Sequence, residues 1–254
     1  MKFWVFGLLI VVLLILLVFS VGSKTESLIE ERLEHYDFHS SKPGPYICLV
    51  AGTHGNEPAG TIALRALATA LSVGNYKLPK GSLRIIPAIN QWGLDHNIRY
   101  HNDFIGILPK SDINRNYQAS GGTENISQMV IDLTQNADLV IDFHEGWGYH
   151  IIQPKSMGST LSPTDYGLAT RIAQQAVRDL NGGSDLLPPK HPFLVRNNES
   201  CTIPTTLGCY MQKNKRAYIL VETTGQNNIQ PLETRVRQVF KIVFTTLNFP
   251  WNKI

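Results

Sequence analysis

Short apolar runs alternate with amphipathic segments along most of this chain, and the alternation restricts the fold more than any other feature. The apolar runs have the length and composition of buried strands; they lie at 46–51, 83–89, 138–143 and 217–221, with a weaker candidate at 149–153. The helical patterns lie at 58–71, 125–136, 164–180 and 232–247. Strands that alternate with helices predict an α/β sandwich with a largely parallel sheet.

The N-terminus carries an uncharged apolar run, residues 3–21, which is long enough for a helix to cross the roughly 30 Å hydrocarbon layer of a bilayer. A cleaved signal peptide is the alternative, because Ser20 and Gly22 are small enough for a cleavage site. The run is longer than the usual signal core of about 7–15 residues, so an uncleaved transmembrane helix is favoured.

These features divide the chain into three parts. Residues 1–22 are predicted to be a transmembrane anchor or signal peptide, and residues 23–45 a polar stalk or linker with a short helix at 26–35. Residues 46–254 are predicted to form the folded domain. Lys2 on the short flank places this domain on the lumenal or extracellular side of a single-pass membrane protein, or outside the cell if the segment is cleaved.

Charge and cysteine content exclude some classes of protein. The chain has 23 Lys+Arg and 20 Asp+Glu, and a formal charge of +3 gives no reason to expect a nucleic-acid partner. Three cysteines are too few for a disulfide scaffold. Cys201 and Cys209 are close enough in sequence to pair, which would leave Cys48 as a core residue in a strand.

Two polar clusters that follow predicted strands contain metal-ligating residue types. His54 and Glu57 lie three apart where a strand gives way to a helix, and imidazole nitrogen and carboxylate oxygen both bind zinc. Alone, this pair also fits an ordinary loop with a glutamate at a helix N-terminus. His144 follows another strand and would be a third ligand, leaving one coordination position for water as in catalytic zinc sites.

Two further clusters lie near strand ends. Arg99 and the run from Asp112 to Tyr117, which contains Asn114 and Arg115, provide guanidinium groups that can bind a carboxylate or stabilise an oxyanion. Glu222 ends an apolar strand, where partial burial would suit a general base. The alternatives are a solvated arginine on a loop and a carboxylate that caps a helix.

The order His-x-x-Glu, Arg, Asn-Arg, His and strand-end Glu resembles the zinc carboxypeptidase superfamily. The run from Gly52 to Glu57 is most similar to its succinylglutamate desuccinylase/aspartoacylase branch. The resemblance covers roughly residues 45–249. It implies a zinc-carboxypeptidase-like α/β/α sandwich with a mixed, largely parallel sheet, and it makes residues 46–254 a zinc hydrolase catalytic domain.

The resemblance also implies a role for each matching residue. His54, Glu57 and His144 would hold one zinc ion per chain. Arg99 would polarise the scissile carbonyl, while Asn114 and Arg115 would bind a substrate carboxylate. Asp112 would orient the first zinc histidine, and Glu222 would act as general base and then as acid. These roles imply cleavage of an amide bond next to a free carboxylate, in a small N-acyl amino acid or a peptide.

Two alternatives remain open at this point. The run from Asn114 to Tyr117 resembles true carboxypeptidases, which remove C-terminal residues from peptides, and Tyr210 is a candidate for their mobile tyrosine, although a loop or core role fits it better. A non-catalytic binding ectodomain with the same fold is the other alternative. The sequence does not explain Glu145, which directly follows the third ligand.

Overall fold

The computed structural model describes residues 33–101, 111–183, 191–197 and 201–249. The predicted membrane segment and nearly all of the predicted stalk helix lie outside these residues. Among the helices that are described, none combines the length and the apolar character needed to cross a bilayer.

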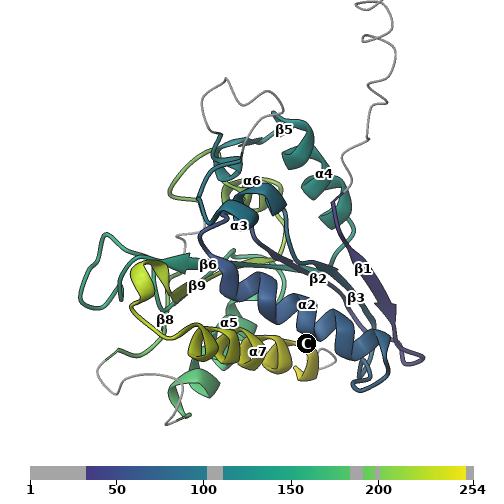
Figure 1. Cartoon of the computed structure of the whole chain (residues 1–254). Coiled ribbons are helices and arrows are strands. Elements are labelled where there is room, and N and C mark those ends of the chain that lie inside the picture. Colours follow the sequence, from purple (N-terminus) through teal and green to yellow (C-terminus); the bar gives the residue numbers. More distant parts are fainter. Residues whose placement is uncertain (1–32, 102–110, 184–190, 198–200, 250–254) are drawn as a thin grey trace, which may run out of the picture. The chain divides into compact units, whose positions relative to one another are not determined.

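A seven-stranded sheet forms the centre of the domain (Figure 1). Its order is β1-β3-β2-β6-β9-β7-β8. The strands are β1 (Tyr36–His39), β2 (Tyr46–Ala51), β3 (Ser82–Ile86), β6 (Leu139–Gly146), β7 (Thr160–Pro163), β8 (Leu194–Val195) and β9 (Tyr218–Thr224). The four central strands run parallel, whereas β1 and β7 pair antiparallel with β3 and β9. The sheet is therefore mixed and largely parallel, as the sequence predicts.

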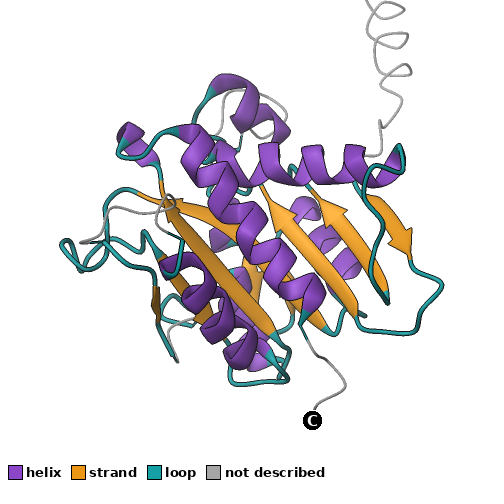
Figure 2. Cartoon of the chain, turned by 90° about the horizontal axis from the view of Figure 1, so that it is seen from below, coloured by secondary structure: helices purple, strands orange, loops and turns teal. Residues whose placement is uncertain are grey.

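Helices cover both faces of the sheet (Figures 1 and 2). One face carries α2 (Pro58–Ser72), α5 (Ala169–Asn181) and α7 (Leu232–Asn248). The other carries α4 (Asn125–Thr134) and α6 (Leu207–Lys213), with α3 (Gln91–His96) on the same side in Figure 1. A small ribbon of β4 (Tyr117–Gln118) and β5 (Gly121–Gly122) and two 3₁₀ turns, η1 (Ile113–Arg115) and η2 (Gln226–Asn228), complete the elements.

The alternation of side chains along the central strands gives the domain two apolar cores. In β2, Ile47 and Leu49 pack with the α2, α5 and α7 side, whereas Cys48 and Val50 pack with α4 and α6. Strands buried on both faces need near-continuous apolar sequence, which is why these runs are recognisable before folding. The thiol of Cys48 is buried in the second core, and burial raises its pKa to about 12.

Several elements differ from the sequence prediction, and all are short or polar. Residues 36–39 were assigned to the linker but form β1, a polar edge strand held by an ion pair between Asp37 and Arg84. The strand expected at 149–153 is wrong: this segment is a turn with a single bridge from Tyr149 to Gly158. The helix expected from residue 164 begins at Ala169 instead.

Candidate metal centre

The three predicted metal ligands meet at the carboxyl edge of the sheet. His54 lies in the loop after β2, Glu57 is the N-cap of α2, and His144 lies near the end of β6. Because β2 and β6 are parallel neighbours with Ala51 opposite Phe143, both segments reach the same edge. The two Nδ1 atoms are 3.1 Å apart, and the Glu57 carboxylate lies 2.9 Å from His54 and 3.0 Å from His144.

These contacts fit a metal ion. The three donor groups are buried, and their ligating atoms lie within 4.8 Å of one another. A tetrahedral site with bonds of 2.0–2.1 Å separates ligand atoms by about 3.3 Å, close to the separations seen here. Two imidazoles and one carboxylate form a donor set of the catalytic type, which leaves a coordination position open.

Each histidine is held by an aspartate at its other ring nitrogen. Nε2 of His54 lies 3.1 Å from Asp112, and Nε2 of His144 lies 3.1 Å from Asp142. Tyr218 in turn donates its hydroxyl to Asp142 at 3.0 Å. Carboxylates in this position fix the tautomer and direct the opposite nitrogen at the metal. The sequence prediction included Asp112 but missed Asp142 and Tyr218.

The Glu57 carboxylate is surrounded by donors as well as by the histidines. Its Oε2 accepts the backbone N–H of Glu145 at 3.0 Å, and its Oε1 accepts from Gln226 at 2.9 Å and from Arg99 at 3.3 Å. Burial alone would raise the pKa of Glu57, but the electrostatic influence of the adjacent His54 and the hydrogen bonds from both histidines lower it well below its usual value. The group therefore stays an anion, as a metal ligand must.

A glycine allows the ligand loop to approach α3 closely. A Cβ added to Gly55 would lie 1.9 Å from the backbone carbon of Gly93, far inside contact distance. Any side chain at this position would push the loop away from α3 and move His54 with it. The segment that carries the ligands His54 and Glu57 therefore also needs a glycine at position 55 in order to pack against α3.

Arg99 and Asp112 form a pair beside the metal centre. The guanidinium donates to Asp112 through Nε at 3.1 Å and through a terminal nitrogen at 3.0 Å, and 29% of its surface is exposed. Burial would raise the pKa of Asp112, but the hydrogen bond from His54 and the nearby positive charges lower it well below its ordinary value. Arg99 thus lies beside the metal centre and lines the same cavity.

Asn114 and Arg115 differ in how their side chains are engaged. Asp112 caps the turn that carries them by accepting the N–H of Asn114. The side-chain oxygen of Asn114 accepts the N–H of Leu207 at 3.0 Å and so joins this turn to the start of α6. Arg115 is 40% exposed, and one of its nitrogens donates to the Asn114 carbonyl. Its guanidinium is accessible to a ligand.

Glu222 lies on β9 directly opposite His144 in the strand register. The carboxyl group is partly exposed to the pocket. Burial raises its pKa to about 8, against the positive charge of His144, and the anion of Glu57 raises it further. A carboxyl group that titrates near neutrality is suited to proton transfer.

A cavity of about 500 Å³ lies at the metal centre, and its size is typical of small-ligand sites. Every site residue predicted from the sequence lines it: His54, Glu57, Arg99, Asp112, Asn114, Arg115, His144 and Glu222. Tyr100, Trp147, Lys155, Met157 and Ile203 also line it and were not predicted as site residues. Tyr210 does not line it and instead packs against the apolar core below α6.

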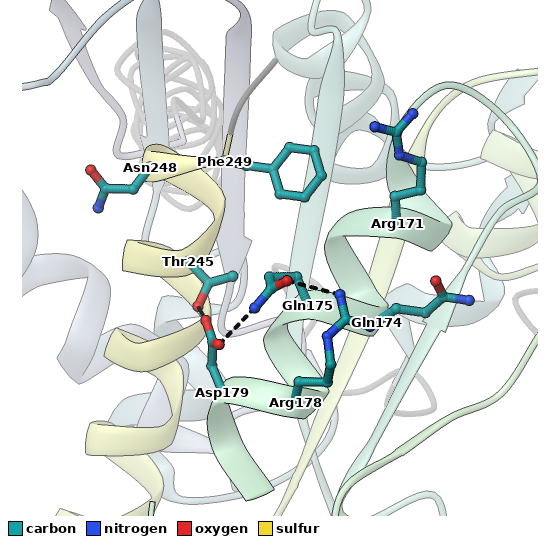
Figure 3. Close-up of a pocket in the computed structure, with 8 residues that line it drawn as sticks. All are labelled: Arg171, Gln174, Gln175, Arg178, Asp179, Thr245, Asn248 and Phe249. Atoms are coloured by element: carbon teal, nitrogen blue, oxygen red, sulfur yellow. Dashed lines mark hydrogen bonds between the residues drawn. The ribbon is translucent and has the colours of Figure 1, made fainter. Parts of the chain in front are cut away.

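A second cavity, of about 570 Å³, lies between α5 and α7 (Figure 3). Among the described residues that line it, the one carboxylate is Asp179, which accepts hydrogen bonds from Gln175 and Thr245, and none is a histidine or cysteine. This cavity therefore lacks the donor set of a metal centre.

Comparison with known families supports the geometry. Residues 43–151, which include all three ligands, match the family described as succinylglutamate desuccinylase/aspartoacylase catalytic domain. This match covers less than half of the chain. The family resemblance predicted from the sequence is thus confirmed. A comparison with the curated proteins finds no match.

Solved structures share the fold of this chain at low identity. Tripeptide-bound Csd4, a cell shape determinant of Helicobacter pylori, matches with a TM-score of 0.67 and 20% identity over 85% of this chain and 55% of that chain. The mDAP-bound form of Csd4, a D,L-carboxypeptidase, matches with a TM-score of 0.65 and 20% identity over 84% of this chain and 54% of that chain. A proposed metallopeptidase of Shewanella amazonensis SB2B matches with a TM-score of 0.60 and 18% identity over 85% of this chain and 81% of that chain. The chain spans about half the length of the Csd4 chains.

Proposed function

We propose that this chain is a zinc-dependent hydrolase that cleaves an amide bond next to a free carboxylate, in the manner of a desuccinylase or aspartoacylase. The observation that carries the proposal is the convergence of His54, Glu57 and His144 in one cavity with Glu222 on the adjoining strand. The chemistry that zinc supplies when bound is Lewis acidity, which acidifies water and polarises a carbonyl.

The residues of the chain divide the remaining work. Glu222 takes a proton from the attacking water and passes it to the leaving amine, and its raised pKa suits both steps. Arg99, held by Asp112, places positive charge where the carbonyl oxygen becomes an anion. Arg115 binds the substrate carboxylate and Asn114 fixes the turn that presents it.

Carboxypeptidase action on peptides is the second candidate, and the likeness to the fold of Csd4 favours it. The local motif supports it less. Tyr117, at the end of the carboxypeptidase-like run, is buried in the apolar core, and Asn116 donates to Ser111. These two residues support packing, whereas Asn114 and Arg115 line the cavity.

An assay of the zinc-loaded domain against N-acyl amino acids and peptides with free C-termini tests the proposal. Deacylation is expected to exceed peptide cleavage, and the isosteric variant Glu222→Gln should abolish both. Faster removal of C-terminal residues would favour the carboxypeptidase. Zinc binding without turnover of either class would favour a binding domain.

We also propose that residues 3–21 attach the enzyme to a membrane with the catalytic domain outside the cytoplasm. The support is the uncharged run itself and, for the orientation, Lys2 on its short flank. Extraction of the full chain from membranes by detergent, but not by high salt or alkaline carbonate, is the expected result; release by salt would contradict it.

A further inference from the structure

Glu145 is the residue that the sequence motif leaves unexplained, and it directly follows the metal ligand His144. Adjacent residues in a strand point to opposite faces, so the Glu145 side chain faces α2 and α7. Only 1% of Glu145 is exposed. Its Oε1 accepts the backbone N–H of Ala59 at 2.7 Å, and its Oε2 accepts from Arg235 of α7.

Arg235 is buried with it, at 4% exposure. Its Nε also donates to the Gln230 carbonyl at 3.2 Å. Gly225 makes room for the pair, because a Cβ there would lie 1.6 Å from a Glu145 oxygen. A buried charge pair costs desolvation and is weak evidence for stability, so a second role is worth seeking.

Hydrogen bonds connect Glu145 to the metal ligand Glu57 in three ways. The backbone N–H of Glu145 donates to Glu57 Oε2 at 3.0 Å. The Glu145 side chain holds Ala59, two residues after Glu57, in the first turn of α2. Gln226 donates both to the Glu145 carbonyl and to Glu57 Oε1. Movement of Glu145 would therefore move the carboxylate that completes the metal centre.

We propose that Glu145, held by Arg235, is a positioning residue for the metal ligand Glu57. The inference rests on the metal site of the proposed function and extends it to α7, which contributes no ligand. Groups that hold a ligand in place typically contribute about 10- to 100-fold to metal affinity. The competing explanation is that the pair only stabilises the fold.

Zinc affinity by chelator competition, with the melting temperature measured in parallel, separates the two explanations. Glu145→Gln keeps an acceptor for Ala59 but leaves the charge of Arg235 without its carboxylate partner, and should weaken zinc binding at least tenfold. The double variant Glu145→Met/Arg235→Met removes both charges and should recover much of the melting temperature while zinc binding stays weak. Arg235→Lys keeps the charge next to Glu145 and should retain part of the wild-type zinc affinity.

Arg216→Met is the matched control. Arg216 donates to Thr134 and Ala137 at the other end of β9, so its loss should lower the melting temperature without changing zinc affinity. Wild-type zinc affinity in both Glu145→Gln and the double variant would overturn the inference. If Glu145→Gln does not fold, the zinc affinities of the double variant and of Arg235→Lys test the inference instead. Absence of zinc binding by the wild type would instead defeat the proposed function.

Discussion

At the scale of single residues, the two histidines of the metal centre share one arrangement. Asp112 and Asp142 each contact an Nε2 atom, which turns both Nδ1 atoms towards Glu57. The two aspartates come from different places, a loop turn and the strand that carries His144 itself. Similar support for both imidazoles indicates a centre built to hold its ligands before the metal arrives.

The proton-transfer role of Glu222 predicts the effect of one substitution. Glu222→Gln preserves size but cannot accept a proton, so turnover should fall by about 10²–10⁴-fold, the usual contribution of a general base. Zinc content should stay at the wild-type value because Glu222 is not a ligand. Turnover equal to wild type would place the base elsewhere.

The pKa of Glu222 also predicts a pH dependence. Burial raises this pKa to about 8, and only the carboxylate form can act as base, so kcat/KM should fall on the acid side. A bound cation stabilises the carboxylate and lowers the pKa, which puts the midpoint at or below about pH 8. A pH profile of kcat/KM tests this, and a profile that rises towards acid would contradict it.

Arg115 should control binding of the substrate carboxylate. Arg115→Ala is expected to raise KM for substrates with a free carboxylate by about 10-fold or more, because a charge-assisted contact is lost. Amidated analogues should be affected little. Arg178→Ala removes an arginine that lines the cavity of Figure 3 and not the cavity of the metal site, and it is the control. An equal loss with amidated substrates would exclude this role.

Residue types and spacing were enough to predict the ligands and their immediate partners, because each belongs to a motif at a strand end. Asp142 was within reach of the same reasoning, since it lies two residues before His144 and must share its face. Gln226, Tyr218 and Arg235 could not be predicted in this way. Their contacts depend on how β9 and α7 pack, which no local pattern encodes.

At the scale of elements, prediction succeeded where apolar periodicity was strong. The central strands β2, β6 and β9 and the helices α2, α4 and α7 lie within a few residues of their predicted bounds. Two strands outside the parallel centre were missed, because β1 mixes polar and apolar residues and β7 contains serine and proline. Their pairing comes from neighbouring strands rather than from their own sequence.

The Cys201–Cys209 disulfide closes a short loop at the cavity, and Thr202, Ile203 and Thr206 in this loop line the wall. Replacing both cysteines by serine should lower the free energy of unfolding by about 2.5 kcal/mol, from the entropy of a loop this short. KM should also rise because part of the wall is released. Denaturant unfolding and steady-state kinetics test both effects; no change in either would show that the bridge is unimportant.

At the scale of the whole molecule, the metal ligands lie inside the segment that matches the family, whereas the proposed base lies outside it. The family match ends at residue 151, before Glu222, so the base is assigned from the strand register and the shared cavity. The walls of the cavity include Trp147, Lys155 and Ile203, which lie on connections rather than on central strands. Such connections determine which acyl group or peptide fits.

The amount of zinc bound per chain tests the central claim most directly. Elemental analysis of the purified domain after zinc loading and gel filtration should give about one zinc per chain for the wild type. His54→Ala and His144→Ala should each give much less while remaining folded by circular dichroism. A wild-type protein without zinc, or histidine variants that retain a full equivalent, would contradict the account.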